Sequence, residues 1–170
     1  MKFERSAIRA KLRAQVRRHE PIILGGAGIG LVAKAADRAG IDLIMAYNTG
    51  PFRMDGAASL CGYLPYGDAN AITEQLGNRM LNVVKNTPVI AGVGASDPYR
   101  NIPMFIDRLM EMGFSGITNV PALGSYEGVI RDQIDALGCG VTPEEATLLY
   151  IAPSTDCGCF CYGNTGADTH

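Results

Sequence analysis

The chain has 170 residues, of which 47% are hydrophobic and 19% are charged, and its formal net charge is −2. This composition excludes an intrinsically disordered chain, which combines low hydrophobicity with high net charge. The longest apolar run is far shorter than the roughly 18 residues of a membrane-spanning helix, so we expect a cytoplasmic protein with no membrane partner.

The first 20 residues form a basic arm with a local charge of +5, whereas the remainder carries −7. Apolar residues recur in the arm mainly every three or four positions, at Phe3, Ala7, Ile8, Leu12 and Val16. This spacing predicts a helix over residues 1–19 with a buried apolar stripe and a solvated basic face. A basic arm can also bind nucleic acid or anionic lipid. We favour the packed helix and expect no nucleic-acid partner.

Beyond the arm, short apolar runs alternate with helical patterns. The predicted strands are residues 22–24, 43–47, 88–93 and 116–120. The predicted helices are residues 30–39, 71–85, 103–112 and 126–137, with a long loop over 48–70. A further helix over 143–151 and a fifth strand over 159–162 follow. The strands are continuous apolar runs, which is typical of parallel strands buried on both faces.

This alternation predicts an α/β fold, either an open doubly wound sheet or a barrel. In both folds, ligands bind at the carboxyl ends of the strands. The glycine-rich and polar segments of the chain lie there, at residues 25–30, 48–70, 94–100 and 121–127. The sequence therefore places its candidate site in these four loops.

Residues 28–33 match the pattern G-x-G-x-x-A of dinucleotide-binding turns. That pattern also requires an acidic residue about 20 positions later, at the end of the second strand. Here this strand ends at Tyr47 and Asn48, so we disfavour a dinucleotide site. Two interpretations stay open: the turn binds a phosphate or carboxylate, or its glycines allow close packing of the strand and the helix.

Four polar residues in the strand-end loops are individually informative. The planar guanidinium of Arg53 suits bidentate capture of a carboxylate or phosphate. Asp68 or Asn70 suits the N-cap of the following helix. Asp97, in a Ser-Asp-Pro sequence, either initiates a turn or offers Mg²⁺ an oxygen ligand at the end of a strand.

The histidines and cysteines of the chain argue against three features: a serine or cysteine hydrolase, a secreted disulfide framework and a structural zinc site. His19 precedes the first strand and there is no other internal histidine, so a serine or cysteine hydrolase would lack its base. The five cysteines are odd in number and do not indicate a secreted disulfide framework. The C-x-C-x-C run of Cys157, Cys159 and Cys161 differs in spacing from structural zinc sites.

Longer motifs fill the same loops: GGAGIGLVAK at 25–34, YNTGPFRM at 47–54, LPYGDAN at 64–70, TPVIAG at 87–92 and NVP at 119–121. Through these motifs the chain resembles the phosphoenolpyruvate hydrolase-like TIM-barrel family, also called TIM-barrel signal transduction proteins. The resemblance runs from about residue 5 to 140, and the segment 141–170 diverges. It implies a single domain with a parallel (β/α)8 barrel. This barrel would be incomplete here, with four to five βα units over 21–140. A capping helix at the N-terminus would precede these units.

The resemblance also implies a function, the binding of a small anionic substrate, a 2-oxo acid or phosphoenolpyruvate, often with Mg²⁺. The substrate-binding residues would be Gly26, Gly28, Lys34, Asn48, Ser59, Asn70 and Asn119. The catalytic residues would be Arg53, Asp97 as the magnesium ligand, and Glu127 as general base, in hydrolase or lyase chemistry. A similar domain occurs in a plant virus-resistance protein, so a non-catalytic ligand-sensing or protein-interaction module is the alternative.

An incomplete barrel has a consequence for assembly. A full barrel of this type usually needs about 250 residues. A sheet that stops after the fourth or fifth strand has an unpaired edge, which favours pairing with another chain. We therefore expect a homo-oligomer.

Overall fold

The computed structural model describes residues 3–136. It divides into two compact units that meet between residues 121 and 122. The first unit contains α1 (Arg5–Arg17), β1 (Leu24–Ala27), α2 (Gly30–Ala39), β2 (Leu43–Ala46), α3 (Thr49–Met54), the 3₁₀ turn η1 (Ser59–Tyr63), α4 (Ala69–Met80), β3 (Val89–Val93), α5 (Ile102–Met112) and β4 (Gly116–Asn119). The second unit contains the 3₁₀ turn η2 (Leu123–Ser125) and α6 (Gly128–Ala136).

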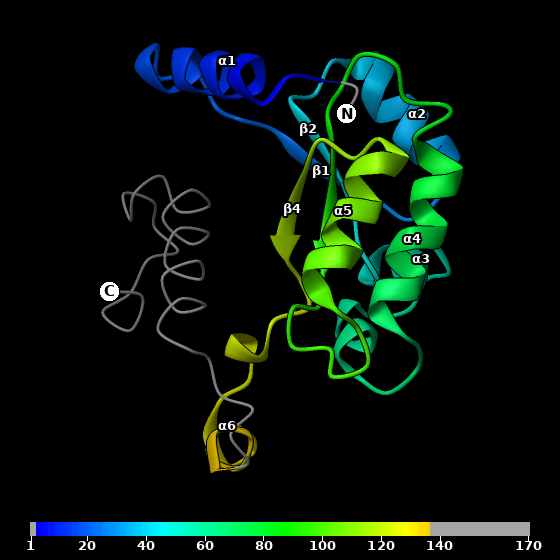
Figure 1. The fold of residues 1–170 in the computed structure, drawn as a ribbon. Coiled ribbons are helices and arrows are strands. Elements are labelled where there is room, and N and C mark those ends of the chain that lie inside the picture. Colours follow the sequence, from blue (N-terminus) through cyan, green and yellow to red (C-terminus); the bar gives the residue numbers. More distant parts are fainter. Residues whose placement is uncertain (1–2, 137–170) are drawn as a thin grey trace. The chain divides into compact units, whose positions relative to one another are not determined.

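The four strands form one parallel sheet in the order β1-β2-β3-β4. The register places Gly26 beside Met45, Met45 beside Ile90, and Ile90 beside Gly116. Helices α2, α4 and α5 cover one face of this sheet (Figure 1). The predicted α/β class with parallel strands is confirmed, and the consecutive strand order agrees with part of a (β/α)8 barrel.

The hydrophobic core lies between the sheet and these helices. Its largest fully buried side chains are Phe114, Ile44, Leu76, Met80, Leu109, Val84 and Val93. The prediction that the strands are buried on both faces holds for β3, where only Ile90 is half-buried, and was wrong for the other three strands. Strand β2 alternates between half-buried and buried positions, and Leu24 on β1 and Ile117 on β4 are 42% and 43% exposed. The physical reason is that helices cover only one face of the sheet.

Local signals placed most element ends correctly. Helices α2 and α5 end at Gly40 and Gly113, which adopt the left-handed conformation as C-caps. Asp68 is the N-cap of α4, and its side chain accepts a hydrogen bond from the Ala71 N–H, as predicted for one of two candidates. Helix α4 ends at Met80 rather than at residue 85.

Two predictions about local structure were wrong. The first strand is β1 rather than residues 22–24, because Gly25 and Gly26 belong to the strand and do not terminate it. The segment 48–70 is not a plain loop, since it contains α3, η1 and the first two residues of α4. Pro51 lies in the first turn of α3, where proline removes no helical hydrogen bond.

Helix α1 was predicted correctly as a helix, but its predicted buried stripe was wrong. No residue of α1 is buried, and Val16 is 60% exposed. Polar contacts hold the helix instead: Gln15 Nε2 and Lys11 Nζ each lie 2.9 Å from Asp42 Oδ1. Ile8 and Leu12 of the stripe are half-buried. In Figure 1, α1 projects past the sheet at the amino ends of the strands.

Several predictions concern residues outside the described part of the chain: the helix over 143–151, the fifth strand over 159–162, and the run of Cys157, Cys159 and Cys161. Within residues 3–136, no helix combines the length and apolar character needed to cross a membrane.

Candidate functional site at the carboxyl ends of the strands

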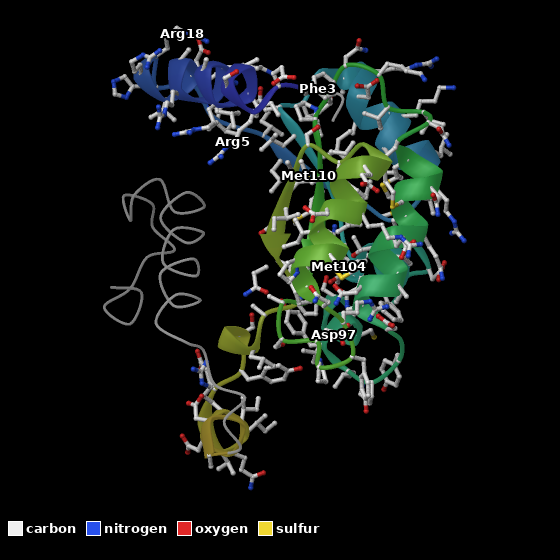
Figure 2. The ribbon with its side chains drawn as sticks, in the orientation of Figure 1. Phe3, Arg5, Arg18, Asp97, Met104 and Met110 are labelled. Atoms are coloured by element: carbon white, nitrogen blue, oxygen red, sulfur yellow. The ribbon has the colours of Figure 1, made fainter. Side chains whose placement is uncertain are left out.

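Two clusters of polar side chains lie in the loops that follow the carboxyl ends of the strands. The first, here called the Arg53 cluster, consists of Gly26, Tyr47, Asn48 and Arg53. The second, the Asp97 network, consists of Asp68, Asn70, Asp97 and Arg100. Figure 2 shows Asp97 at the end of the sheet opposite to α1.

The Arg53 cluster forms because α3 starts immediately after β2. This short connection brings the Arg53 guanidinium over the ring of Tyr47, with 5.6 Å between the guanidinium carbon and the ring centroid. Gly26 on β1 completes the arrangement, because a Cβ atom there would lie 2.9 Å from Arg53 Nη2 and 3.0 Å from the Tyr47 hydroxyl. The missing side chain of Gly26 is therefore what lets Tyr47 and Arg53 extend over β1.

The charge of Arg53 is not neutralised locally. Arg53 is exposed and has no acidic ion-pair partner among residues 3–136. Its planar guanidinium carries five N–H donors. A guanidinium that is positioned by an aromatic ring and has no carboxylate beside it fits a carboxylate or phosphate ligand.

Asn48 supplies a second polar feature of the cluster. It is 3% exposed, and its Nδ2 donates a hydrogen bond of 2.5 Å to the carbonyl of Gly62, which ties η1 to the end of β2. Its Oδ1 has no hydrogen-bond partner among the described residues. An unpaired buried acceptor beside a strand end requires a donor from water or from a ligand.

In the Asp97 network, the buried side chain of Asn70 joins α4 to the end of β3. Its Oδ1 accepts from the Gly94 N–H at 2.9 Å, and its Nδ2 donates to the Gly94 carbonyl at 3.1 Å and to Asp97 Oδ2 at 2.9 Å. Asp97 Oδ1 accepts from the Tyr99 N–H at 2.9 Å, so the predicted turn role of Asp97 is confirmed. Arg100 donates to Asp97 Oδ2 and, at 2.7 Å, to Asp68 Oδ2.

These contacts keep the network charged. Burial by itself would raise the pKa of Asp97, but hydrogen bonds from Asn70, the Tyr99 N–H and Arg100 outweigh it and hold the pKa below its ordinary value. The pKa of Asp68 is lowered in the same way, against burial, mainly by Arg100. The hydrogen bond to Asp68 raises the pKa of Arg100. At neutral pH the network therefore holds one cation between two carboxylates.

The side chain of Asp97 does not fit a magnesium ligand in this arrangement. Both of its oxygens accept hydrogen bonds from protein donors, and one of those donors is the cationic Arg100. No group of three or more histidine, cysteine, aspartate or glutamate residues within the described part of the chain could hold a metal ion.

The remaining predicted site residues are scattered. Lys34 on α2 and Ser59 at the start of η1 are exposed, and Asn119 Oδ1 accepts a 3.4 Å hydrogen bond from the Ala95 N–H. Glu127 belongs to the second unit. The roles of these four residues in binding or catalysis stay predictions.

The surroundings of Gly28 favour close packing over anion binding as the role of the G-x-G-x-x-A turn. It is buried, and a Cβ atom on it would lie 2.1 Å from the carbonyl oxygen of Gly50. A Cβ atom on Gly30 would lie 3.0 Å from the carbonyl oxygen of Arg79 on α4. Both glycines thus have packing roles, and ligand binding by Gly28 stays a prediction.

Two residues of these clusters, Tyr47 and Arg100, were not predicted from the sequence. Tyr47 follows directly on β2, where an aromatic side chain is equally typical of the strand itself. Arg100 lies three residues after Asp97, a spacing that allows an ion pair across one turn. This spacing was the available signal for Arg100.

Comparison with known proteins gives consistent matches. A model of the family described as phosphoenolpyruvate hydrolase-like matches residues 7–169, and so extends into the segment expected to diverge. The ToMV resistance protein Tm-1(GCR237) and the ToMV susceptible protein tm-1(GCR26), both of Solanum lycopersicum, are each 44% identical to this chain over 137 residues. A putative transcriptional regulatory protein, y4pA, of Sinorhizobium fredii is 30% identical over 165 residues.

These matches cover most of this chain but little of each relative. They include 81% of this chain for the two tomato proteins and 96% for the Sinorhizobium protein. The chain spans 18% of the length of each tomato protein and 27% of the Sinorhizobium protein.

Proposed function

Because the chain belongs to the phosphoenolpyruvate hydrolase-like family, we propose that the carboxyl end of its sheet binds a small 2-oxo acid or a phosphoenolpyruvate-like anion. The observation that carries this proposal is the position of Arg53, over Tyr47 and Gly26 and without an acidic partner among residues 3–136. Arg100, in the loop after β3, is by contrast already paired with Asp68 and Asp97. Arg53 is therefore the arginine in these loops that is open to a ligand anion.

The proposed roles follow from the donors and acceptors present. Arg53 binds the carboxylate or phosphate through paired N–H donors, a geometry that this side chain suits. Tyr47 and Gly26 position the guanidinium. The Oδ1 of Asn48, which lacks a partner among the described residues, accepts a hydrogen bond from a water molecule bound with the ligand.

Turnover is a separate part of the proposal. In hydrolysis of phosphoenolpyruvate, water attacks phosphorus, the bond from phosphorus to the enol oxygen breaks, and the products are inorganic phosphate and pyruvate. Arg53 would stabilise the negative charge on the transferred group. The proton of the water passes to a general base, the role that the sequence predicts for Glu127.

A binding module without turnover is the second candidate. It is favoured by the names of the relatives, since one is a virus-resistance protein and another is a putative transcriptional regulatory protein. Neither name is that of an enzyme. In this case Arg53 and Asn48 would hold the anion, and occupancy rather than chemistry would be the output.

Calorimetric titration with phosphoenolpyruvate, pyruvate and oxaloacetate tests the binding site. We expect Arg53→Met to weaken binding of the preferred anion at least about tenfold, which corresponds to loss of about 1.4 kcal/mol. The matched control is Arg38→Met, because Arg38 is exposed in the last turn of α2 at the opposite end of the sheet. Equal affinity of the Arg53→Met variant and the wild type would refute the site.

Phosphorus NMR of the wild type incubated with phosphoenolpyruvate separates the two candidates. Growth of the inorganic phosphate signal, lost in Arg53→Met, supports the enzyme. Binding with an unchanged phosphoenolpyruvate signal over many hours supports the module.

A further inference from the structure

Arg100 lies between two carboxylates that come from different elements. Asp68 is the N-cap of α4, and Asp97 lies in the loop between β3 and α5. Arg100 Nη2 donates to Asp68 and Nη1 donates to Asp97, and the three side chains are 24%, 50% and 15% exposed, respectively. The guanidinium carbon also lies 5.5 Å from the centroid of the Phe105 ring on α5, which holds Arg100 in place.

Two carboxylates that share one guanidinium at the end of a parallel sheet favour a positive charge between them, because like charges repel. A divalent cation is one source of that charge, and hard cations prefer carboxylate oxygens. Here the Arg100 guanidinium supplies the charge together with directed hydrogen bonds. We infer that Arg100 is a built-in counterion in the place of a divalent cation, so that the loop after β3 is ordered without metal.

Both carboxylates would keep other hydrogen-bond donors if Arg100 were removed. Asp68 would still accept from the Ala71 N–H, and Asp97 would still be held by Asn70 and by the Tyr99 N–H. These hydrogen bonds would hold both carboxylates near one another against their mutual repulsion, with no cation between them. Divalent cations bind carboxylate oxygens at about 2.0–2.6 Å, so loss of Arg100 should create a divalent-cation site that the wild type lacks.

Titration with Mn²⁺ tests this inference in four proteins: the wild type, Arg100→Met, Arg100→Lys and Arg108→Met. Arg108 is the matched control, because it joins α5 to Glu74 on α4, a single carboxylate. We expect Arg100→Met to bind Mn²⁺ at least tenfold more tightly than the other three, and Mn²⁺ to raise its thermal midpoint by about 2–4 °C. The wild type and Arg108→Met should shift by less than about 1 °C. Arg100→Lys keeps a cation between the carboxylates and should gain nothing.

A double variant shows whether the gain comes from the two carboxylates. Adding Asp68→Asn to Arg100→Met should abolish the Mn²⁺ response. The inference is overturned if the wild type binds Mn²⁺ as tightly as Arg100→Met, or if folded Arg100→Met gains no affinity.

If Arg100→Met does not fold, the wild type decides the question by itself. Mn²⁺ that selectively broadens the NMR signals of the Asn70 side-chain amide overturns the inference, and an unaffected amide upholds it. Anion binding at Arg53 is measured separately, so failure of this inference is distinguishable from failure of the proposed function.

Discussion

Gly50 fits against Gly28 so closely that neither position has room for a side chain. A Cβ atom on Gly28 would lie 2.1 Å from the Gly50 carbonyl oxygen, and one on Gly50 would lie 2.8 Å from the Gly28 Cα. This contact packs the first turn of α3 against the turn that follows β1. Since Arg53 lies three residues further along α3, the two glycines also determine where its guanidinium is placed.

We therefore predict that Gly28→Ala destabilises the fold by about 1–3 kcal/mol, the usual cost of overpacking, and weakens anion binding because α3 must move. Urea denaturation measures the first effect and calorimetric titration the second. Gly94→Ala is the control, because the nearest atom to its added Cβ would lie 3.6 Å away, an ordinary contact. A Gly28→Ala variant as stable as Gly94→Ala would show that the packing is looser than the structure indicates.

Asp37 gives the stability of the fold a dependence on pH. It is 6% exposed on α2, and its carboxylate accepts hydrogen bonds from the N–H groups of Lys85, Asn86 and Thr87 at 3.0, 2.8 and 2.8 Å. Burial alone would raise the pKa of Asp37, but these hydrogen bonds lower it below the ordinary value. A lowered pKa in the folded state stabilises the protein above the unfolded-state pKa, about 3.9 for aspartate.

Asp37→Asn should accordingly cost about 2–4 kcal/mol at pH 7, because it removes one acceptor oxygen and places an NH₂ group against backbone N–H donors. The difference in unfolding free energy from the wild type should shrink as the pH falls below about 4, since Asp37 of the unfolded chain is protonated there before Asp37 of the folded protein is. Denaturation curves at pH 7, 5, 4 and 3 measure it. A difference that stays constant down to pH 3 would mean that Asp37 is not the titrating group.

Asp42 should control the attachment of α1. No residue of α1 is buried. Asp42 accepts a hydrogen bond from Gln15 of that helix and forms an ion pair with Lys11. It also accepts a hydrogen bond from the Ile23 N–H at 3.0 Å. We predict that Asp42→Ala releases α1, so that trypsin cleaves after Arg9 and Arg13 several times faster than in the wild type. Gel analysis of a digestion time course measures the rate.

Glu20→Gln is the control for that prediction. It breaks the exposed Arg18–Glu20 pair, which is local to the end of α1 and does not join the helix to the sheet. Unchanged cleavage in Asp42→Ala would mean that contacts other than those of Asp42 hold the helix.

The correct predictions were those that depend on near neighbours in the sequence. Gly40 and Gly113 end their helices because a left-handed C-cap needs only the local backbone to turn. The same local signals failed at Gly26 and Gly50, because neither glycine marks a turn. Gly26 makes room for Arg53 and Tyr47, and Gly50 makes room for Gly28, which are distant in the sequence.

The amino-acid sequence alone therefore determined the parallel α/β class, the loops where polar residues collect, and Arg53 as the anion-binding candidate. Only the tertiary structure decided which side chains meet. Arg100 and Asp68 are 32 residues apart, and Asn70 and Asp97 are 27 apart. Such pairs depend on strand register and on how helices pack against the sheet, which hydrophobic periodicity does not specify. The packing of α4 and the loop after β3 thus made Asp97 the partner of Arg100, where its position after a strand had predicted a magnesium ligand.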